Sequence, residues 1–229
     1  MIELKDVTHF ATTLRGKGRC VIQGINLAIP MGRRLALIGD PYEDVRVVID
    51  LMAGAVVPSA GRIIRNSSTS FLAGDIRMFV PELSVRGNVQ HAARLYAEEA
   101  RATVDFVQRC LGLGSDFERP FGALPKSVQK SVSHIIAYSI PFDIYILTET
   151  LKGGGGLNEV AFALLNARAD NHGVIVPTRN FRFAKEFCNG ALLYQQNNLT
   201  MIDNVQEAVR ALGEHQRVPG KRRVSVSVQ

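Results

Sequence analysis

The pattern of apolar and polar positions along the chain predicts an α/β fold. Short runs with strand-like alternation or continuous apolar character are interleaved with segments whose apolar residues recur at helical spacing. Strands are expected at 3–8, 20–29, 34–38, 62–65, 70–73, 144–147, 173–176, 191–194 and 199–202. Helices are expected directly after 34–38 and at 85–97, 100–111, 126–139, 157–169, 180–187 and 205–212. Apolar strands that alternate with helices indicate a mainly parallel sheet covered on both faces, preceded here by antiparallel N-terminal strands.

The composition is that of a globular cytosolic protein. The 229 residues are 46% hydrophobic and 21% charged, which suits one large domain or two tightly joined lobes. No apolar run approaches the roughly 18 residues of a membrane span, and the first residues lack the basic flank and apolar core of a signal peptide. Cys20, Cys110 and Cys188 are scattered and odd in number, which predicts reduced thiols.

The net charge of +6 leaves two kinds of anionic partner to consider. No cluster of base-stacking aromatic residues accompanies the basic ones, so nucleic acid is not expected as a partner. A basic tail at 213–229 is interpreted as solvated, although four cations at about 1 kcal/mol each could help docking on an anionic leaflet. These cations are Arg217, Lys221, Arg222 and Arg223. The histidines at 91, 134 and 172 have no ligand spacing, so no metal site is expected.

The stretch around Gly39 has the frame of a phosphate-binding loop without its chemistry. The apolar strand 35–38 reaches Gly39 and a helix follows at once, as in the pattern G-x-x-x-x-G-K-[ST]. That pattern needs glycines so that backbone N–H groups converge on phosphate, followed by a lysine and a hydroxyl. Here Asp44, Val45 and Arg46 fill the positions of the second glycine, the lysine and the hydroxyl.

The residues after Gly39 predict an ordinary helix start instead of a wide loop. Asp40 is expected to cap the helix and Pro41 to begin it, with Glu43 in the first turn. Glu43 and Asp44 would then bring carboxylates to the positive end of the helix, where an anion normally binds. A triphosphate would meet repulsion of roughly 1 kcal/mol from each acid in water and about 4 kcal/mol at intermediate dielectric.

The order of these elements resembles the nucleotide-binding subunits of ABC transporters, in particular those that export capsular polysaccharide and related glycans. The resemblance covers about residues 1–212 and is carried by the segments 25–32, 35–39, 58–63, 84–89, 93–97 and 185–188. It implies an ABC-ATPase-like, P-loop NTPase fold with a helical insert at about 82–140, and ATP and Mg²⁺ as the family's cofactors. The remaining residues, 213–229, form the basic tail.

The resemblance also identifies the positions of the family's ATP site. The cofactor-binding positions of the degenerate phosphate loop are Gly39, Tyr42, Asp44, Val45, Arg46 and Val47. The signature segment, which holds the γ-phosphate on the partner subunit's ATP, corresponds to 124–129 and contains Ser127 but no glycine. A nucleotide-stacking aromatic would be Phe10.

Three further motifs of the family have altered residues here. The strand that ends in Asp-Glu in the family ends here in Thr148 and Glu149, so Glu149 is the one residual catalytic residue. Glu149 is also consistent with an ordinary carboxylate at a strand end. The following loop is the glycine run 153–156, interpreted as mobile. The switch histidine corresponds to Thr178 or Arg179, depending on a one-residue gap.

Two functions follow from this resemblance. The favoured one is a non-hydrolysing pseudo-ATPase subunit with no cofactor, bound peripherally to a permease on the cytoplasmic face of the inner membrane, as a homodimer or heterodimer. The alternative is an active ATPase subunit that uses Mg·ATP to energise polysaccharide export. A decaying gene copy is a third possibility. The permease is expected to dock at 71–88, where the apolar lining would be Phe71, Leu72, Met78, Phe79 and Val80.

Overall fold

The computed structural model describes residues 1–12, 18–151 and 155–217. Its strands are β1 (Ile2–Thr12), β2 (Gly18–Ile29), β3 (Arg34–Gly39), β4 (Ala60–Arg65), β5 (Ile144–Ile146), β6 (Gly173–Pro177), β7 (Gly190–Gln195) and β8 (Asn198–Ile202). Its helices are α1 (Tyr42–Ala53), α2 (Val85–Tyr96), α3 (Ala100–Leu111), α4 (Lys126–Ser139), α5 (Leu157–Ala169), α6 (Phe181–Phe187) and α7 (Val205–Arg217). Two 3₁₀ turns, Gly114–Glu118 and Phe121–Ala123, lie between α3 and α4.

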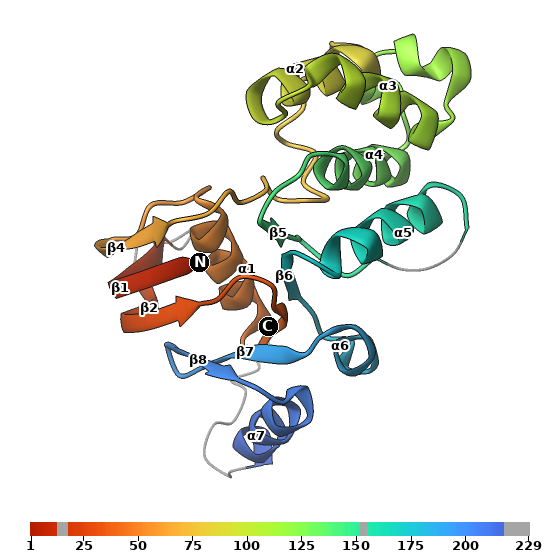
Figure 1. Cartoon of the computed structure of the whole chain (residues 1–229). Helices are drawn as coiled ribbons and strands as arrows, with labels where there is room; N and C mark the ends of the chain where they lie inside the picture. The colour runs from red at the N-terminus through yellow and green to blue at the C-terminus, as the bar shows by residue number, and fades with distance from the viewer. Residues whose placement is uncertain (13–17, 152–154, 218–229) are drawn as a thin grey trace, which may run out of the picture.

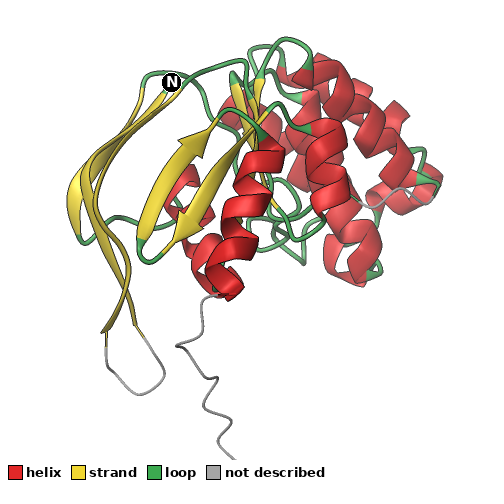
Figure 2. Ribbon diagram, turned by 90° about the horizontal axis from the view of Figure 1, so that it is seen from below, coloured by secondary structure: helices red, strands yellow, loops and turns green. Residues whose placement is uncertain are grey.

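The strands form two sheets, which confirms the predicted α/β class (Figure 1). The larger sheet has the order β5-β6-β3-β7-β8, with parallel pairing throughout except for the antiparallel edge strand β8. The smaller sheet, β2-β1-β4, is antiparallel. Figure 2 shows the strands on one side of the molecule and most of the helices on the other.

Strand β3 is buried on both faces, which explains its continuous apolar run. Leu35 and Leu37 point to one side and join a core with α1 and the antiparallel sheet. Ala36 and Ile38 point to the other side and join a core with the helices of the 85–139 region. Successive side chains of a strand alternate between faces, so this strand contributes side chains to both cores.

The predicted helical insert is present as α2, α3 and α4 with the two 3₁₀ turns. Its core contains Phe79, Phe121 and apolar side chains from all three helices. The buried Asn88 holds the loop that leads into this region. Its side chain accepts from the Val80 N–H at 2.8 Å and donates to the Val80 carbonyl at 2.9 Å. A buried amide satisfied in this way fixes the approach of the preceding loop to α2.

The structure differs from the predicted elements most clearly at 70–73, at the end of α7, and at the end of β1, which runs to Thr12 and not to 8. The segment 70–73 is not a strand, because the Ile146 N–H donates to the Ser70 hydroxyl at 2.9 Å where a continuous ladder would use a backbone carbonyl. Only single bridges join it to the β5 region, at Thr69 and Ala73. Helix α7 continues to Arg217, past the predicted end at 212. Part of the glycine run 153–156 and the tail from residue 218 onward lie outside the described residues.

Arg65 on β4 connects the antiparallel sheet to the end of α1. Its guanidinium donates to the Leu51 carbonyl at 2.6 Å and to the Met52 carbonyl at 2.9 Å. These carbonyls belong to the last turn of α1, which contains no basic residue of its own and ends at Gly54 with φ +79°. A cation on the carbonyl end of a helix also complements the helix dipole.

We expect Arg65→Met to lower the free energy of unfolding by about 2 kcal/mol, because two helix-end carbonyls lose a charged donor. Urea unfolding measures this. Arg62→Met is the matched control: Arg62 lies on the same strand, is exposed and forms no ion pair with any described residue. It should change the free energy by less than about 0.5 kcal/mol. Equal effects of the two changes would contradict the capping role.

Candidate functional site

The candidate site lies at the carboxyl ends of the parallel strands, where α/β folds place their ligands. A cavity of about 250 Å³ opens there. It is lined by Arg46, Ile49, Asp50, Gly74, Asp75, Ile76, Arg77, Lys130, Thr148, Glu149 and Pro177. Of the predicted site residues, the structure brings Arg46 and Glu149 together here. Asp50, Asp75, Arg77 and Lys130 were not predicted, because none of them occupies a catalytic or phosphate-binding position of the motifs.

The connection from β3 to α1 is short. In this fully described stretch only Asp40 and Pro41 separate Gly39 from Tyr42, so the expected absence of a wide phosphate loop is confirmed. The expected cap is wrong. Pro41, not Asp40, occupies the N-cap position, and no side chain of the described residues caps the helix. The extended backbone of Pro41 (φ −74°, ψ 149°) delays the helix by one residue, so Asp40 lies too early to reach its free N–H groups.

Gly39 is required by packing against β7. A Cβ atom at this position would lie 2.5 Å from the Tyr194 carbonyl oxygen and 2.6 Å from the Tyr194 Cβ. Gly39 and Tyr194 are directly paired in the parallel ladder. The one glycine that remains from the phosphate-loop pattern therefore has a structural role that needs no phosphate.

Asp44 points into the protein, contrary to the expected carboxylate at the anion site. The residue is 2% exposed, and its Oδ2 lies 2.9 Å from the Tyr194 hydroxyl, which also lies 2.8 Å from the Val21 carbonyl. Its Oδ1 forms an ion pair with Arg19. Burial, together with the hydrogen bond and the negative charge of Asp44, raises the pKa of Tyr194. Helix phase explains the difference, since the first turn of α1 directs position 44 toward β2 and β7.

The other phosphate-loop positions divide between core and cavity. Val45 is fully buried, and Val47 is half-buried against the same core. Arg46 is exposed and lines the cavity. Tyr42 lies under Arg179, whose guanidinium carbon is 4.3 Å from the ring centroid. Thr178 is buried, so Arg179 is the residue of the predicted switch pair that contacts the start of α1.

The end of β5 has a hydroxyl where a metal-supporting carboxylate was considered. The Thr148 N–H and hydroxyl both donate to the Ala73 carbonyl, at 3.0 and 3.1 Å. Glu149 forms an ion pair with Lys130 at 2.6 Å, and both side chains are about half-exposed. Ser127, from the predicted signature segment, is exposed in the first turn of α4.

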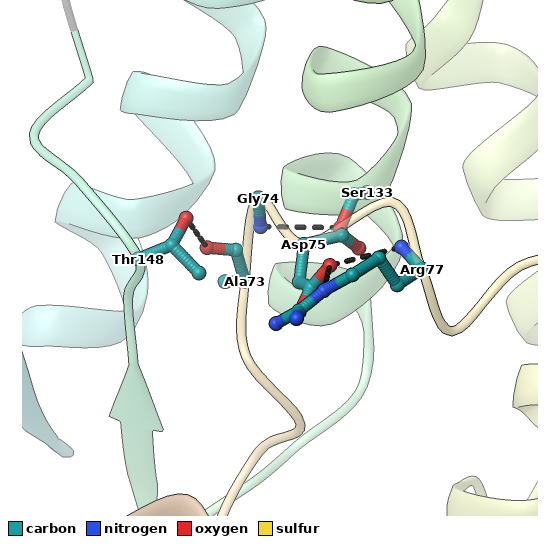
Figure 3. A network of polar contacts seen from close by, with 6 residues as sticks. All are labelled: Ala73, Gly74, Asp75, Arg77, Ser133 and Thr148. Atoms are coloured by element: carbon teal, nitrogen blue, oxygen red, sulfur yellow. Dashed lines mark hydrogen bonds and ion pairs between the residues drawn. The ribbon is translucent and has the colours of Figure 1, made fainter. Parts of the chain in front are cut away.

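A polar network fixes the 73–77 segment at the cavity wall (Figure 3). The Gly74 N–H donates to the Ser133 hydroxyl at 3.1 Å, and that hydroxyl donates to the Asp75 carbonyl at 3.0 Å. Gly74 has φ +93°, and a side chain there would collide with His134 and Thr148. The Asp75 carboxylate holds the Arg77 guanidinium at 2.6 and 3.0 Å. The wall is therefore positioned by glycine geometry and by paired charges.

The charges of the cavity balance. Three cations, Arg46, Arg77 and Lys130, face three carboxylates, Asp50, Asp75 and Glu149. Burial raises the pKa of Asp75, but the hydrogen bonds and charge of Arg77 outweigh it and hold that pKa below its ordinary value. Burial raises the pKa of Asp50, and the charges of Arg77 and Arg46 offset part of this rise, to which the negative charge of Asp75 adds.

These residues do not fit Mg·ATP bound in the family's usual way. The N–H groups of Asp44 and Val45 donate to the Pro41 carbonyl, at 3.1 and 3.4 Å, so they do not converge on an external anion. The lysine position is a buried valine, and Thr148 offers its hydroxyl to a carbonyl. Two of the three cavity cations are already paired with carboxylates.

A second hollow of about 400 Å³ lies beside the helical region. It is lined by Ala53, Gly54, Ala55, Thr69, Ser70, Phe71, Leu72, Asp75, Met78 and Tyr96. The predicted docking segment therefore contributes to this groove through Phe71, Leu72 and Met78, whereas the predicted Phe79 and Val80 do not line it. Phe79 is 5% exposed and packs on Phe121 in the core, and Leu72 is only 6% exposed. A charge at either position would disrupt the core instead of the groove surface.

The structure resembles ATP-binding cassettes. It is similar to a dimeric, post-hydrolysis cassette MJ0796 bound to ADP and Pi, with a TM-score of 0.73 and 16% identity over 90% of this chain and 99% of that one. It is also similar to cbiO1 from Clostridium perfringens, part of an ABC transporter complex, with a TM-score of 0.64 and 20% identity over 95% of each chain. The chain thus has the ABC-ATPase form of the P-loop fold, as the resemblance in sequence predicted.

Sequence comparison gives a narrower relationship. The chain is 27% identical to the polysialic acid transport ATP-binding protein KpsT of Escherichia coli, over 91% of this chain and 95% of that protein. It is 26% identical to the O-antigen export ATP-binding protein RfbB of Myxococcus xanthus, over 58% of this chain and 31% of that protein. No protein-family model matches the chain. The chain is distantly related to the ATP-binding proteins of these export systems.

The described residues contain neither a metal-binding cluster nor a membrane-spanning helix. Within 1–12, 18–151 and 155–217, no group of three or more His, Cys, Asp or Glu residues could hold a metal ion. None of the helices in the described ranges combines the length and the apolar character that crossing a membrane requires. Cys188 is buried, and burial raises the pKa of its thiol to about 12.

His134, behind the Gly74 wall, makes stability depend on pH. It is buried, its Nδ1 lies 2.9 Å from the Tyr138 hydroxyl, and burial lowers its pKa to about 4. The charges of Glu149 and Lys130 act on it in opposite directions. A histidine that stays neutral when folded takes up a proton on unfolding between its folded pKa and its ordinary value of about 6.5.

We therefore expect the free energy of unfolding to fall by about 3 kcal/mol from this histidine as the pH drops from about 6.5 to 4. Denaturant unfolding at a series of pH values measures it. His134→Gln should flatten the slope across this window. His91→Gln, at an exposed position on α2, should leave it unchanged. Identical slopes for the unmodified protein and His134→Gln would refute the assignment.

Proposed function

We propose that the chain is a non-hydrolysing ATP-binding-cassette subunit of a polysaccharide export ABC transporter. The fold and the distant relationship to KpsT and RfbB support the transporter assignment. One observation carries the loss of catalysis: the cavity at the carboxyl ends of the strands has a self-balanced set of charges and no phosphate loop. Phosphoryl transfer depends on positioning and charge neutralisation, and these residues supply neither for a nucleotide.

An active ATPase is the second candidate. Glu149 at the end of β5 supports it, because it keeps the position of a water-activating carboxylate, and the relatives are ATP-binding proteins. Against it, Glu149 is paired with Lys130, and the residue before it is a threonine bound to a carbonyl. Glu149 would need Lys130 to move away before it could activate water.

The partner in this proposal is a membrane permease of the inner membrane. This chain binds it peripherally at the cytoplasmic face, as part of a dimer. The groove lined by Phe71, Met78 and Tyr96 supports permease docking, because its aromatic and apolar surface could accept a short helix. Tyr96 is exposed although its ring contacts Phe71 and Phe142. An aromatic side chain that is supported from behind and open in front is typical of an interface anchor.

We expect calorimetric titration of the unmodified protein with Mg·ATP to give no heat of micromolar binding. Phosphate release should stay at background with the permease present, because no described group replaces the missing phosphate ligands. Glu149→Gln is the matched variant, and its phosphate release should also stay at background. Micromolar binding with turnover that disappears in Glu149→Gln would establish the active ATPase instead.

Docking is tested at the groove surface. We expect Ala55→Glu together with Met78→Glu to release the chain from membranes that contain its permease, because both residues line the groove and neither is buried. Fractionation after co-expression measures the membrane-bound share. Val57→Glu, at a highly exposed position that does not line the groove, is the control and should stay bound. Membrane association unchanged by the double substitution would count against this surface.

A further inference from the structure

Two of the three cations of the cavity are paired with carboxylates of its own lining. Arg77 is held by Asp75 through both carboxylate oxygens, and Lys130 is held by Glu149 at 2.6 Å. Arg46 lines the same cavity and forms no ion pair with any described residue. The cavity of about 250 Å³ has room for roughly eight waters, so its size does not exclude a phosphate or pyrophosphate.

We propose that Asp75 and Glu149 are specificity-determining residues that act as internal anions: they occupy Arg77 and Lys130 and so keep phosphate-bearing ligands out of this cavity. The inference rests on the proposed absence of nucleotide binding and assigns it to two named side chains. Without them, three cations would remain, with Asp50 as the opposing carboxylate.

The geometry supports this role over a purely structural one. The Asp75 carboxylate pairs with the Arg77 guanidinium two residues later and also accepts the Arg77 backbone N–H at 2.9 Å. The acid and its cation therefore belong to one turn. That turn is anchored from behind by Ser133. Lys130 and Glu149 come from different elements, α4 and the end of β5, and both line the cavity. An entering anion must displace both carboxylates or meet their repulsion.

The test is the double variant Asp75→Asn with Glu149→Gln. Each amide keeps one acceptor oxygen, and at position 75 that oxygen can still accept the Arg77 N–H. The wall should therefore survive, and urea unfolding checks this. Pyrophosphate is the probe, titrated with ³¹P NMR detection and by calorimetry. Removing one negative charge near an anion should strengthen binding about fivefold, so the double variant should gain at least about 25-fold. Arg77→Gln with Lys130→Gln, added to the double variant, should abolish the gain.

The matched control is Asp116→Asn with Glu118→Gln. It makes the same change in net charge and removes two ion pairs, with Arg119 and Arg86, that do not line the cavity. If this control gains as much affinity, or if the Asp75/Glu149 variant folds and gains none, the inference is overturned while the proposed function stands. If the unmodified protein binds Mg·ATP with micromolar affinity, the proposed function fails as well.

Discussion

Tyr194 on β7 governs the junction between β3 and α1, and the site follows from that junction. Its backbone packs so closely on Gly39 that no side chain fits there, and its hydroxyl lies 2.9 Å from the Asp44 carboxylate. Together these contacts bring α1 directly up to the strand end and turn position 44 inward. Because the helix starts at Tyr42, no wide loop is left whose N–H groups could converge on an anion.

The same contacts let α1 stand without a ligand. In a phosphate-binding fold the start of this helix is stabilised by the anion it binds. Here Asp44 is tied to Tyr194 and Arg19 at one end of α1, and Arg65 satisfies carbonyls at the other. The carboxylate of Asp44, at the position of the expected loop glycine, thus fixes the start of the helix through contacts within the protein.

Sequence reasoning identified the framework well, and the structure explains why. Helices α3, α4 and α5 have the predicted bounds, because their apolar spacing is a local property that the core they share reinforces. The cavity was only half predictable. Arg46 and Glu149 belong to motif positions, whereas the pairing of Lys130 with Glu149 depends on how α4 packs beside β5. The direction of Asp44 depends on Tyr194, 150 residues later in the chain, and no local pattern contains it.

The distribution of altered residues separates what folding needs from what a nucleotide needs. Gly39 is the one glycine that matches the phosphate-loop pattern, and a side chain there would collide with Tyr194. The positions that differ from the phosphate-loop pattern, Val45 and Arg46, are respectively a core residue and an exposed one, and each suits its environment without a ligand. The residues at these positions are thus explained by packing and exposure within the protein itself. This agrees with the proposal that the chain contributes its fold and its surfaces, and not hydrolysis.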